Sequence, residues 1–321
     1  MDSNKKNLRF TKDYNLPINI FNDDMFSYYR ELYKDFWPLD AENRMNHEIE
    51  QFNGNVDQWL EHYGKIRDNI IFNLENSEEY KKFNNSDMSC YDVLDLGVGE
   101  HSIYTEETVG KTFLSIDLKK ANFQALKYAC VLNDNTYADF IYRMNGSQYF
   151  ADSKYLRQVI FGKLNPKRQI KVEKFIVYKI HKLVFSKFFL NELKLIYPDS
   201  ISLWSFNSDE IVYLVNENYF NPTEDFLKSV EDFIKESYGF EIRAELVKIS
   251  RLNIVNCNGN KVDAYIRKNV ITGVETLKKA STTFFPQIWK LYKGLEIEEI
   301  DRMFYVENQI AIFKEPLKII P

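Results

Sequence analysis

The chain of 321 residues is long enough for about two domains and can bury a core without disulfide bonds. Apolar residues make up 45% of it and charged residues 28%, which excludes disordered and low-complexity classes and indicates a folded globular protein. The net charge of −5 excludes a protein that is basic throughout, so any nucleic-acid-binding role requires a local concentration of positive charge.

Three cysteines, Cys90, Cys130 and Cys257, lie too far apart in the sequence to form a CxxC knuckle, and their odd number argues against a disulfide framework. The first residues lack the apolar stretch of a signal peptide, and no run of about 18 uncharged apolar residues occurs. We therefore expect a cytoplasmic protein that does not bind a membrane. The abundance of Phe, Tyr, Asn, Lys and Ile is typical of an AT-rich genome, such as that of a phage, a virus or a low-GC bacterium.

Apolar residues recur at helical spacing in the N-terminal part of the chain. Residues 1–20 are predicted to form a tail or arm, and residues 23–82 to form amphipathic helices. The polar residues 84–87 interrupt this pattern. Short strands are then predicted at 91–96, 101–105 and 112–118.

The middle of the chain combines helices with a hairpin. Helices are predicted at about 120–133 and 166–196, the second beginning at Asn165-Pro166, a cap followed by a proline in the first turn. Strands 201–206 and 211–215 flank the acidic turn 207–210. A helix should follow and run to Tyr238, stopped by Gly239, with a strand at about 240–252 after it.

We divide the chain into a helical N-terminal region (1–90), an α+β core (91–270) and a C-terminal extension of helix and short strands (271–321). The order from residue 111 to residue 252 is strand, helix, helix, hairpin, helix, strand. In a split β-α-β sheet, a ferredoxin-like arrangement, the first strand and the hairpin are neighbours. Asp117 and Asp209 would then meet, and two such carboxylates can hold two divalent ions for phosphoryl transfer.

The segment 115–123, Ser-Ile-Asp-Leu-Lys-Lys-Ala-Asn-Phe, resembles motif A in the palm domain of template-dependent polymerases, the group of reverse transcriptases and viral RNA-dependent polymerases. By this resemblance Asp117 is a catalytic metal ligand, and Asn122 or Phe123 is the residue that checks the sugar. Residues 205–210 resemble motif C, which makes Asp209 the second metal ligand with Glu210 beside it.

The resemblance extends to two further motifs. Residues 161–169 are similar to motif B, a glycine-containing loop that opens a long helix holding template and nucleotide. Residues 224–252 resemble motif D, in which Lys248 is the candidate proton donor to pyrophosphate. The resemblance covers residues 111–252 and implies a palm-like antiparallel sheet backed by helices, Mg²⁺ or Mn²⁺ as cofactor, and nucleic acid and nucleoside triphosphates as partners. Residues 23–82 and 253–321, or partner proteins of a replication or transcription complex, would supply fingers and thumb.

The charge distribution independently favours nucleic-acid binding. Residues 153–194 hold eleven basic and two acidic residues, a local charge of +9. Several of these cations are spaced to share one helical face that could follow a phosphate backbone, although charge runs are also common on solvated helix faces. The candidate contacts are Arg157, Lys163, Lys167, Arg168 and Lys171.

Two other classes of function remain open. Residues 92–100, Asp-Val-Leu-Asp-Leu-Gly-Val-Gly-Glu, are similar to the first motif of methyltransferases that use S-adenosylmethionine, and Asp117 lies 22 residues beyond Asp95, where those enzymes place a ribose-binding acid. The third hypothesis is a non-catalytic subunit that binds nucleic acid within a larger replication or transcription assembly.

Overall fold

A computed structural model describes residues 2–18, 22–192, 200–306 and 309–320. Its centre is a six-stranded sheet in which every pair of neighbouring strands is antiparallel, in the order β2-β3-β1-β4-β7-β8. The six strands are β1 (Thr112–Leu118), β2 (Ile201–Phe206), β3 (Glu210–Val215), β4 (Ile242–Arg251), β7 (Tyr265–Asn269) and β8 (Glu275–Lys278). The predicted α+β class, with an antiparallel sheet backed by helices, is confirmed.

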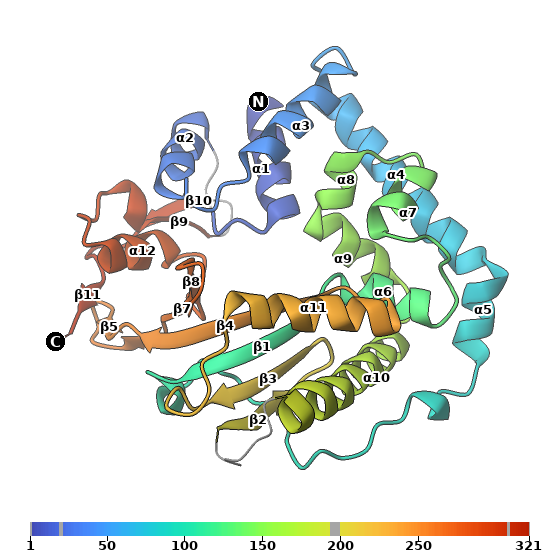
Figure 1. Cartoon of the computed structure of the whole chain (residues 1–321). Helices are drawn as coiled ribbons and strands as arrows, with labels where there is room; N and C mark the ends of the chain where they lie inside the picture. Colours follow the sequence, from blue (N-terminus) through green and yellow to red (C-terminus); the bar gives the residue numbers. More distant parts are fainter. Residues whose placement is uncertain (1, 19–21, 193–199, 307–308, 321) are drawn as a thin grey trace.

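Two long helices cover one face of the sheet. They are α10 (Pro166–Val184), which leads into β2, and α11 (Glu224–Tyr238), which joins β3 to β4. Figure 1 shows both helices lying over the sheet, and their buried residues share one core cluster with Leu114 and Ile116 of β1. As a result β3 lies between β1 and β2, and β1 lies between β3 and β4.

The opposite face of the sheet, which we call the open face, carries a second and smaller apolar cluster. It contains Phe113, Val212 and Val247, with Ile103 from the chain before β1 packed on them. Because side chains alternate between faces along a strand, Phe113, Ser115 and Asp117 all belong to the open face. The candidate acid of β1 therefore points away from α10 and α11.

Local sequence signals explain the ends of the predicted elements. The Thr223 hydroxyl accepts a hydrogen bond from the Phe226 amide at 3.3 Å and caps α11, and Gly239 ends this helix with a left-handed φ of 72°. Asn165 caps α10 in the same way, accepting from the Arg168 amide at 3.4 Å. The hairpin of β2 and β3 forms where the sequence predicts it.

The N-terminal region is helical, as predicted, but its first residues are not an arm. The Asp13 carboxylate is fully buried and accepts hydrogen bonds from Tyr63, Tyr149 and Ser153 at 2.7–2.8 Å, with the Arg9 guanidinium 3.2 Å away. The prediction of an arm was wrong because the packed face of this first helix is largely polar, with Asn7, Thr11 and Asp13 buried beside Phe10, and so lacks apolar periodicity. The five helices are α1 (Asp2–Tyr14), α2 (Asp23–Leu32), α3 (Leu39–Glu50), α4 (Val56–Asn76) and α5 (Glu78–Asn85).

Short helices fill the chain between β1 and α10. The first, α6 (Ala121–Tyr128), matches the predicted helix 120–133 in part. Three others were not predicted, and they are α7 (Tyr137–Arg143), α8 (Gln148–Asp152) and α9 (Lys154–Lys163). After α10 the chain continues as a π-helical stretch at Phe185–Glu192, and the end of the predicted helix 166–196 lies outside the described residues.

Residues 86–105, which we call the strap, connect α5 to the region before β1. The strands predicted at 91–96 and 101–105 do not form, although all these residues are described, and the strap contains only the short helical turn Ser89–Tyr91. A further turn, Glu106–Thr108, follows it. Asp92, Asp95 and Glu100 face water along the strap, and Gly97 has a left-handed φ of 70°, so these residues do not fit a paired strand.

The C-terminal residues pack against the N-terminal helices. Lys290 in α12 (Phe285–Lys293) is buried and forms ion pairs with Glu298 and Asp301 at 2.7 and 2.9 Å. The Tyr28 hydroxyl of α2 donates to the Asp301 carboxylate at 2.8 Å, across 273 residues of sequence. Two small sheets complete this part of the chain, one of β5 (Ile254–Val255), β6 (Lys261–Val262) and β11 (Lys318–Ile319), and one of β9 (Met303–Val306) and β10 (Gln309–Ile312).

Within the described part of the chain, every helix is too short or too polar to cross a membrane.

Candidate active site at one end of the sheet

The structure brings Asp117 and Asp209 to the same end of the sheet. Asp117 is the second-last residue of β1 and lies opposite Glu210 in the β1–β3 register. The backbone amide of Leu118 donates to the Asp209 carbonyl oxygen at 2.8 Å, which fixes the hairpin tip against the end of β1. Asp209 itself is exposed, whereas Asp117 is half-buried. These two acids therefore meet although 92 residues separate them.

Glu210 joins Asp117 on the open face. Its carboxylate accepts a hydrogen bond from the Ser115 hydroxyl at 2.6 Å, along the same row of side chains. Burial raises the pKa of Asp117. The positive charge of Arg243 partly offsets this increase, and the negative charge of Asp209 adds to it. Burial also raises the pKa of Glu210, with the Ser115 hydrogen bond acting against it. Such mutual repulsion among carboxylates is relieved by a divalent cation.

Cations from several elements surround this acidic group. The Arg243 guanidinium of β4 lies 3.3 Å from the Asp117 carboxylate, and the neighbouring Glu245 pairs with Arg267 of β7 at 2.7 Å. Lys278 of β8 is half-buried, and its pKa is lowered by burial and by the charges of Arg267, Lys154 and Arg243. This end of the open face therefore combines carboxylates with cations beside them.

Two further cations come from the helical layer after β1. Arg157 of α9 and Lys120 both lie over the ring of Tyr137, at 5.9 and 5.4 Å from its centre. Burial lowers the pKa of each, and the negative charge of Asp117 acts on Arg157. Lys120 has a left-handed φ of 51°, which is uncommon for a residue with a side chain and occurs immediately before α6. Arg157, predicted as a nucleic-acid contact, thus faces the acidic end of the sheet.

A buried pair lies on the other side of Asp209. Asn122 of α6 donates its side-chain amide to the Glu173 carboxylate of α10 at 2.7 Å, and only 3% of the Glu173 surface is exposed. Burial, reinforced by the charge of Asp209, raises the pKa of Glu173 to about 7, and the Asn122 hydrogen bond acts in the opposite direction. Glu173 therefore exchanges its proton close to neutral pH.

The raised pKa makes the stability of the protein depend on pH. Between pH 4.5 and about 7 the folded state holds the Glu173 proton more tightly than the unfolded state, so ionisation of this group lowers stability as the pH rises through this range. The variant Glu173→Gln keeps an acceptor for Asn122 but has no charge. We expect it to be about 3 kcal/mol more stable than the wild type above pH 7 and nearly equal to it at pH 4.5.

Thermal unfolding at pH 4.5, 6 and 7.5 measures this difference. The exposed Glu224 of α11 provides a control, since Glu224→Gln removes the charge of a solvated side chain and should change the melting temperature at pH 7.5 by much less than Glu173→Gln does. A Glu173→Gln melting temperature that follows the wild type at every pH would contradict the assignment.

Phe123 does not contribute to the open site. Only 3% of its surface is exposed, and its ring packs on Tyr137 and Phe140 at 5.8 and 6.3 Å. Because Asn122 and Phe123 are consecutive on α6, only one of them can face the acids, and the apolar side chain takes the core position. Of the two sugar-checking candidates, the structure leaves Asn122.

Lys248 lies at the wrong end of the sheet for the role predicted for it. It is opposite Thr112 in the β1–β4 register, whereas Arg243 is opposite Asp117. The five residue steps from Arg243 to Lys248 correspond to about 16 Å along the strand. The Lys248 ammonium pairs instead with Glu217 at 3.5 Å. The expectation was wrong because the register of β4, which the sequence does not reveal, decides which cation reaches the acids.

The predicted cations of the α9–α10 region are partly engaged within the chain. Lys163 and Lys167 are exposed. Lys171 pairs with Asp92 of the strap at 2.5 Å, and Arg168 donates to the Ser86 hydroxyl at 3.0 Å. Lys174, one turn further, pairs with Glu100 at 3.6 Å. The basic face exists on α10, and the strap covers its central part.

The methyltransferase-like motif does not have the surroundings that its chemistry needs. That chemistry requires a strand of a parallel sheet, a glycine turn and then a helix. Residues 92–100 belong to the strap, where none of them is in a strand or helix, and the sheet beside them is antiparallel. Asp117 is in β1 of this antiparallel sheet, so it does not share with these glycines the cofactor-binding crevice of a parallel sheet.

The donor atoms at the end of the sheet suit magnesium. Among the described residues, no group of three or more His, Cys, Asp or Glu side chains has the spacing of a metal site. Mg²⁺, however, is commonly held by one or two carboxylates together with water and substrate phosphates. Asp117 and Asp209 supply such a pair of hard oxygen donors, so the residues fit a metal that is completed by its substrate.

Several residues of this site were not found from the sequence. Glu173 was the conspicuous case, since it is an acid at a core position of α10, between Val172 and Ile176, within a strongly basic stretch. Arg243, Lys120 and Lys278 gave no signal, because only the strand register and the chain crossing after β1 bring them to the acids.

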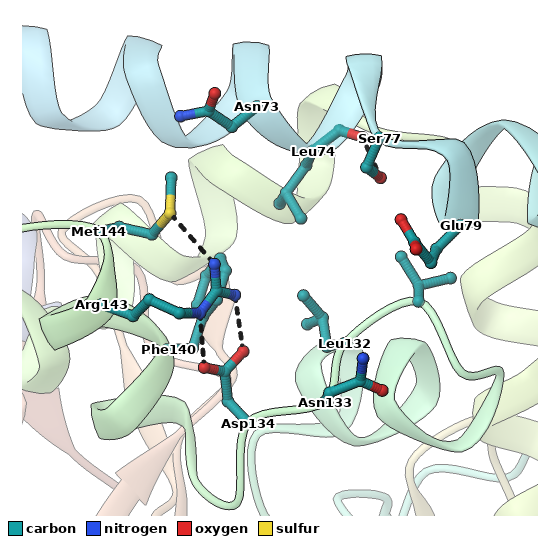
Figure 2. A pocket seen from close by; sticks show the side chains of 11 residues that line it. Asn73, Leu74, Ser77, Glu79, Leu132, Asn133, Asp134, Phe140, Arg143 and Met144 are labelled. Atoms are coloured by element: carbon teal, nitrogen blue, oxygen red, sulfur yellow. Dashed lines mark hydrogen bonds and ion pairs between the residues drawn. The ribbon is translucent and has the colours of Figure 1, made fainter.

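A separate hollow lies between α4, α5 and α7 and has a volume of about 390 Å³ (Figure 2). Arg143 and Asp134 form a two-point ion pair on its wall at 2.8 and 2.7 Å, and Glu79 lies across from them. Its lining contains none of the predicted site residues. Because Arg143 and Asp134 already neutralise each other, this pair has little net charge with which to bind an ion.

Comparison with known proteins does not identify a relative: no family model, no curated protein and no solved structure matches the chain.

Proposed function

We propose that the protein is a metal-dependent nucleotidyltransferase, similar to a polymerase, that adds nucleotides to the 3′ end of a nucleic acid. The observation that supports this most directly is the meeting of Asp117 and Asp209 at one end of the antiparallel sheet. The strand order, with β3 between β1 and β2 and β1 between β3 and β4, is the split β-α-β arrangement expected of a palm domain.

The acids would hold the metal. Asp117 and Asp209 approach from adjacent strands, and Glu210 lies beside Asp117 with its carboxylate oriented by Ser115. Bound Mg²⁺ would supply Lewis-acid activation of the attacking hydroxyl and stabilise the leaving pyrophosphate. In the reaction the 3′ oxygen forms a bond to the α-phosphorus of the triphosphate, its proton passes to solvent, and the bond to pyrophosphate breaks.

The cations of the open face would bind the triphosphate. Arg243 is in contact with Asp117, and Arg157 and Lys120 share the face of Tyr137 within the electrostatic influence of Asp117. A triphosphate carries several negative charges, which guanidinium groups bind with paired hydrogen bonds. Arg243 takes the place on β4 that the sequence assigned to Lys248.

Asn122 is the candidate for contacting the sugar. Its amide is held by Glu173 next to Asp209, while Phe123 is buried. A polar amide at this position would donate a hydrogen bond to a sugar hydroxyl or accept one from it. A bulky apolar side chain would instead exclude the hydroxyl.

An extension assay tests the proposal. A labelled primer annealed to a template is incubated with the protein, Mg²⁺ or Mn²⁺, and either ribo- or deoxynucleoside triphosphates. We expect extension that EDTA abolishes and that Asp209→Asn lowers by about 10²-fold or more. Failure to extend with both metals and both nucleotide sets contradicts the proposal. Salt-dependent binding of the primer that survives loss of both aspartates would then favour a non-catalytic binding subunit.

A further inference from the structure

The strap lies on the face of α10 that would bind a phosphate backbone. Its contacts follow this helix in order, from Ser86 on Arg168, through Asp92 on Lys171, to Glu100 on Lys174. The ring of Tyr91 packs on Phe175 at 5.6 Å between these polar contacts. A serine hydroxyl and two carboxylates of the strap thus occupy successive cations at the spacing of helical turns, as the oxygens of a phosphate backbone would.

The strap also reaches the candidate active site. The Phe206 amide of β2 donates to the Gly99 carbonyl at 3.3 Å, and the His101 amide donates to the Ser205 hydroxyl at 3.0 Å. Ser205 and Phe206 directly precede the hairpin tip that carries Asp209. The strap therefore passes from the basic face of α10 to the edge of the sheet beside the acids.

The attachment is weak in the part that covers α10. The side chains of Asp92 and Glu100 are 67% and 64% exposed, and exposed ion pairs contribute little to stability. Gly97 has a left-handed φ, and a side chain added at this position would meet no other atom within 4 Å, so the turn at Gly97 is not itself packed against the rest of the protein. Residues 92–100 contribute no fully buried side chain, and their apolar contact with the core is limited to the partly buried Val93 and Leu96.

One cation under the strap is poorly satisfied. Arg168 donates to Ser86 through one terminal nitrogen, while its Nε atom is buried and has no hydrogen-bond partner among the described residues. Its guanidinium lies 5.4 Å from the ring of Phe83. A phosphate oxygen could accept from Nε and a terminal nitrogen together, which the strap does not do.

We propose that residues 86–100 of the strap form an intramolecular cover on the α10 phosphate-binding face, which a nucleic-acid backbone must displace in order to bind. This inference rests on the proposed function for the identity of the ligand. Binding is then a competition between strap carboxylates and phosphates for Lys171 and Lys174, and the cover favours strands that carry enough phosphates to replace it.

The test compares two double variants that change the net charge equally. Asp92→Asn with Glu100→Gln removes the strap carboxylates, whereas Asp232→Asn with Glu236→Gln removes exposed carboxylates of α11. The binding of a fluorescent 20-nucleotide single strand is followed by anisotropy at several salt concentrations. We expect the strap variant to bind about threefold to tenfold more tightly than the α11 variant. Thermal unfolding verifies that both variants are folded.

Each outcome of this binding experiment supports or overturns the proposed cover. Equal affinity of the two variants overturns the cover, because the gain would then come from net charge alone, and so does an absence of binding by all proteins. The extension assay run in parallel separates the two proposals. Tighter binding by the strap variant without any extension keeps the cover and rejects nucleotidyl transfer, whereas extension with equal affinities rejects the cover only.

Discussion

Replacing Asp117 with Asn should lower nucleotide incorporation by about 10³-fold while leaving the protein folded. Asp117 is the acid that β1 brings to the hairpin tip, and its loss removes one of the two carboxylates that would hold the metal. Because burial raises the pKa of Asp117, the ionised side chain is a cost to the folded state, and a neutral amide should unfold at the same temperature or higher. Loss of activity without loss of stability is the expected signature.

Primer extension and thermal unfolding of the same preparation measure both quantities. Glu217→Gln provides the matched control, because Glu217 pairs with Lys248 at the opposite end of the sheet. We expect this variant to extend primers at the wild-type rate. Extension by Asp117→Asn at more than a tenth of the wild-type rate would reject the role of Asp117.

Replacing Asp13 with Ala should destabilise the protein by about 3–5 kcal/mol. The carboxylate is fully buried and joins four elements, since Tyr63 of α4, Tyr149 of α8 and Ser153, which caps α9, all donate to this residue of α1. Removing it leaves the Tyr149 hydroxyl without an acceptor, leaves the Tyr63 and Ser153 hydroxyls with only their contact of 3.3 Å to each other, and leaves the Arg9 guanidinium without its ion pair. The cost of an unpaired buried cation dominates.

Urea unfolding gives the free-energy difference. Asp57 forms an exposed pair with Lys5 at 2.6 Å, so Asp57→Ala should cost less than about 1 kcal/mol. Asp13→Asn, which keeps one acceptor oxygen, should fall between the two. If Asp13→Ala unfolds within 1 kcal/mol of the wild type, the buried network does not hold these helices together.

Local signals in the sequence were sufficient for the inner sheet and its two covering helices. The acidic turn between two apolar runs predicted the hairpin, and Gly239 and Asn165 marked a helix end and a helix start. These signals act over three to five residues, so they survive in any tertiary context. They also placed Asp117 and Asp209 at the ends of neighbouring strands, since hairpin and split β-α-β connections leave few alternatives.

The missing parts depend on contacts far apart in sequence. The helices α7, α8 and α9 are five to ten residues long, too short for periodicity to reveal, and their caps Thr136 and Ser153 are the only local marks. The register of β4 against β1 places Arg243, and not Lys248, beside Asp117. This register is set by pairing between residues far apart in the sequence. The strands predicted in the strap do not form because its acidic side chains pair with α10 and only isolated hydrogen bonds, at Gly99 and His101, join it to β2. The sequence therefore predicted the acids of the site but not most of the cations around them.

The hydrogen bond between Tyr28 and Asp301 has a consequence for how the chain is made. Helix α2 is synthesised early, but the acid that receives its tyrosine leaves the ribosome 273 residues later. Until then Tyr33 and Phe36 lack the rings of Phe285 and Trp289 in α12, and the Tyr29 hydroxyl lacks the Ile300 carbonyl that accepts its hydrogen bond. The nascent chain thus carries an aromatic surface in need of protection until α12 has been synthesised and docks against it.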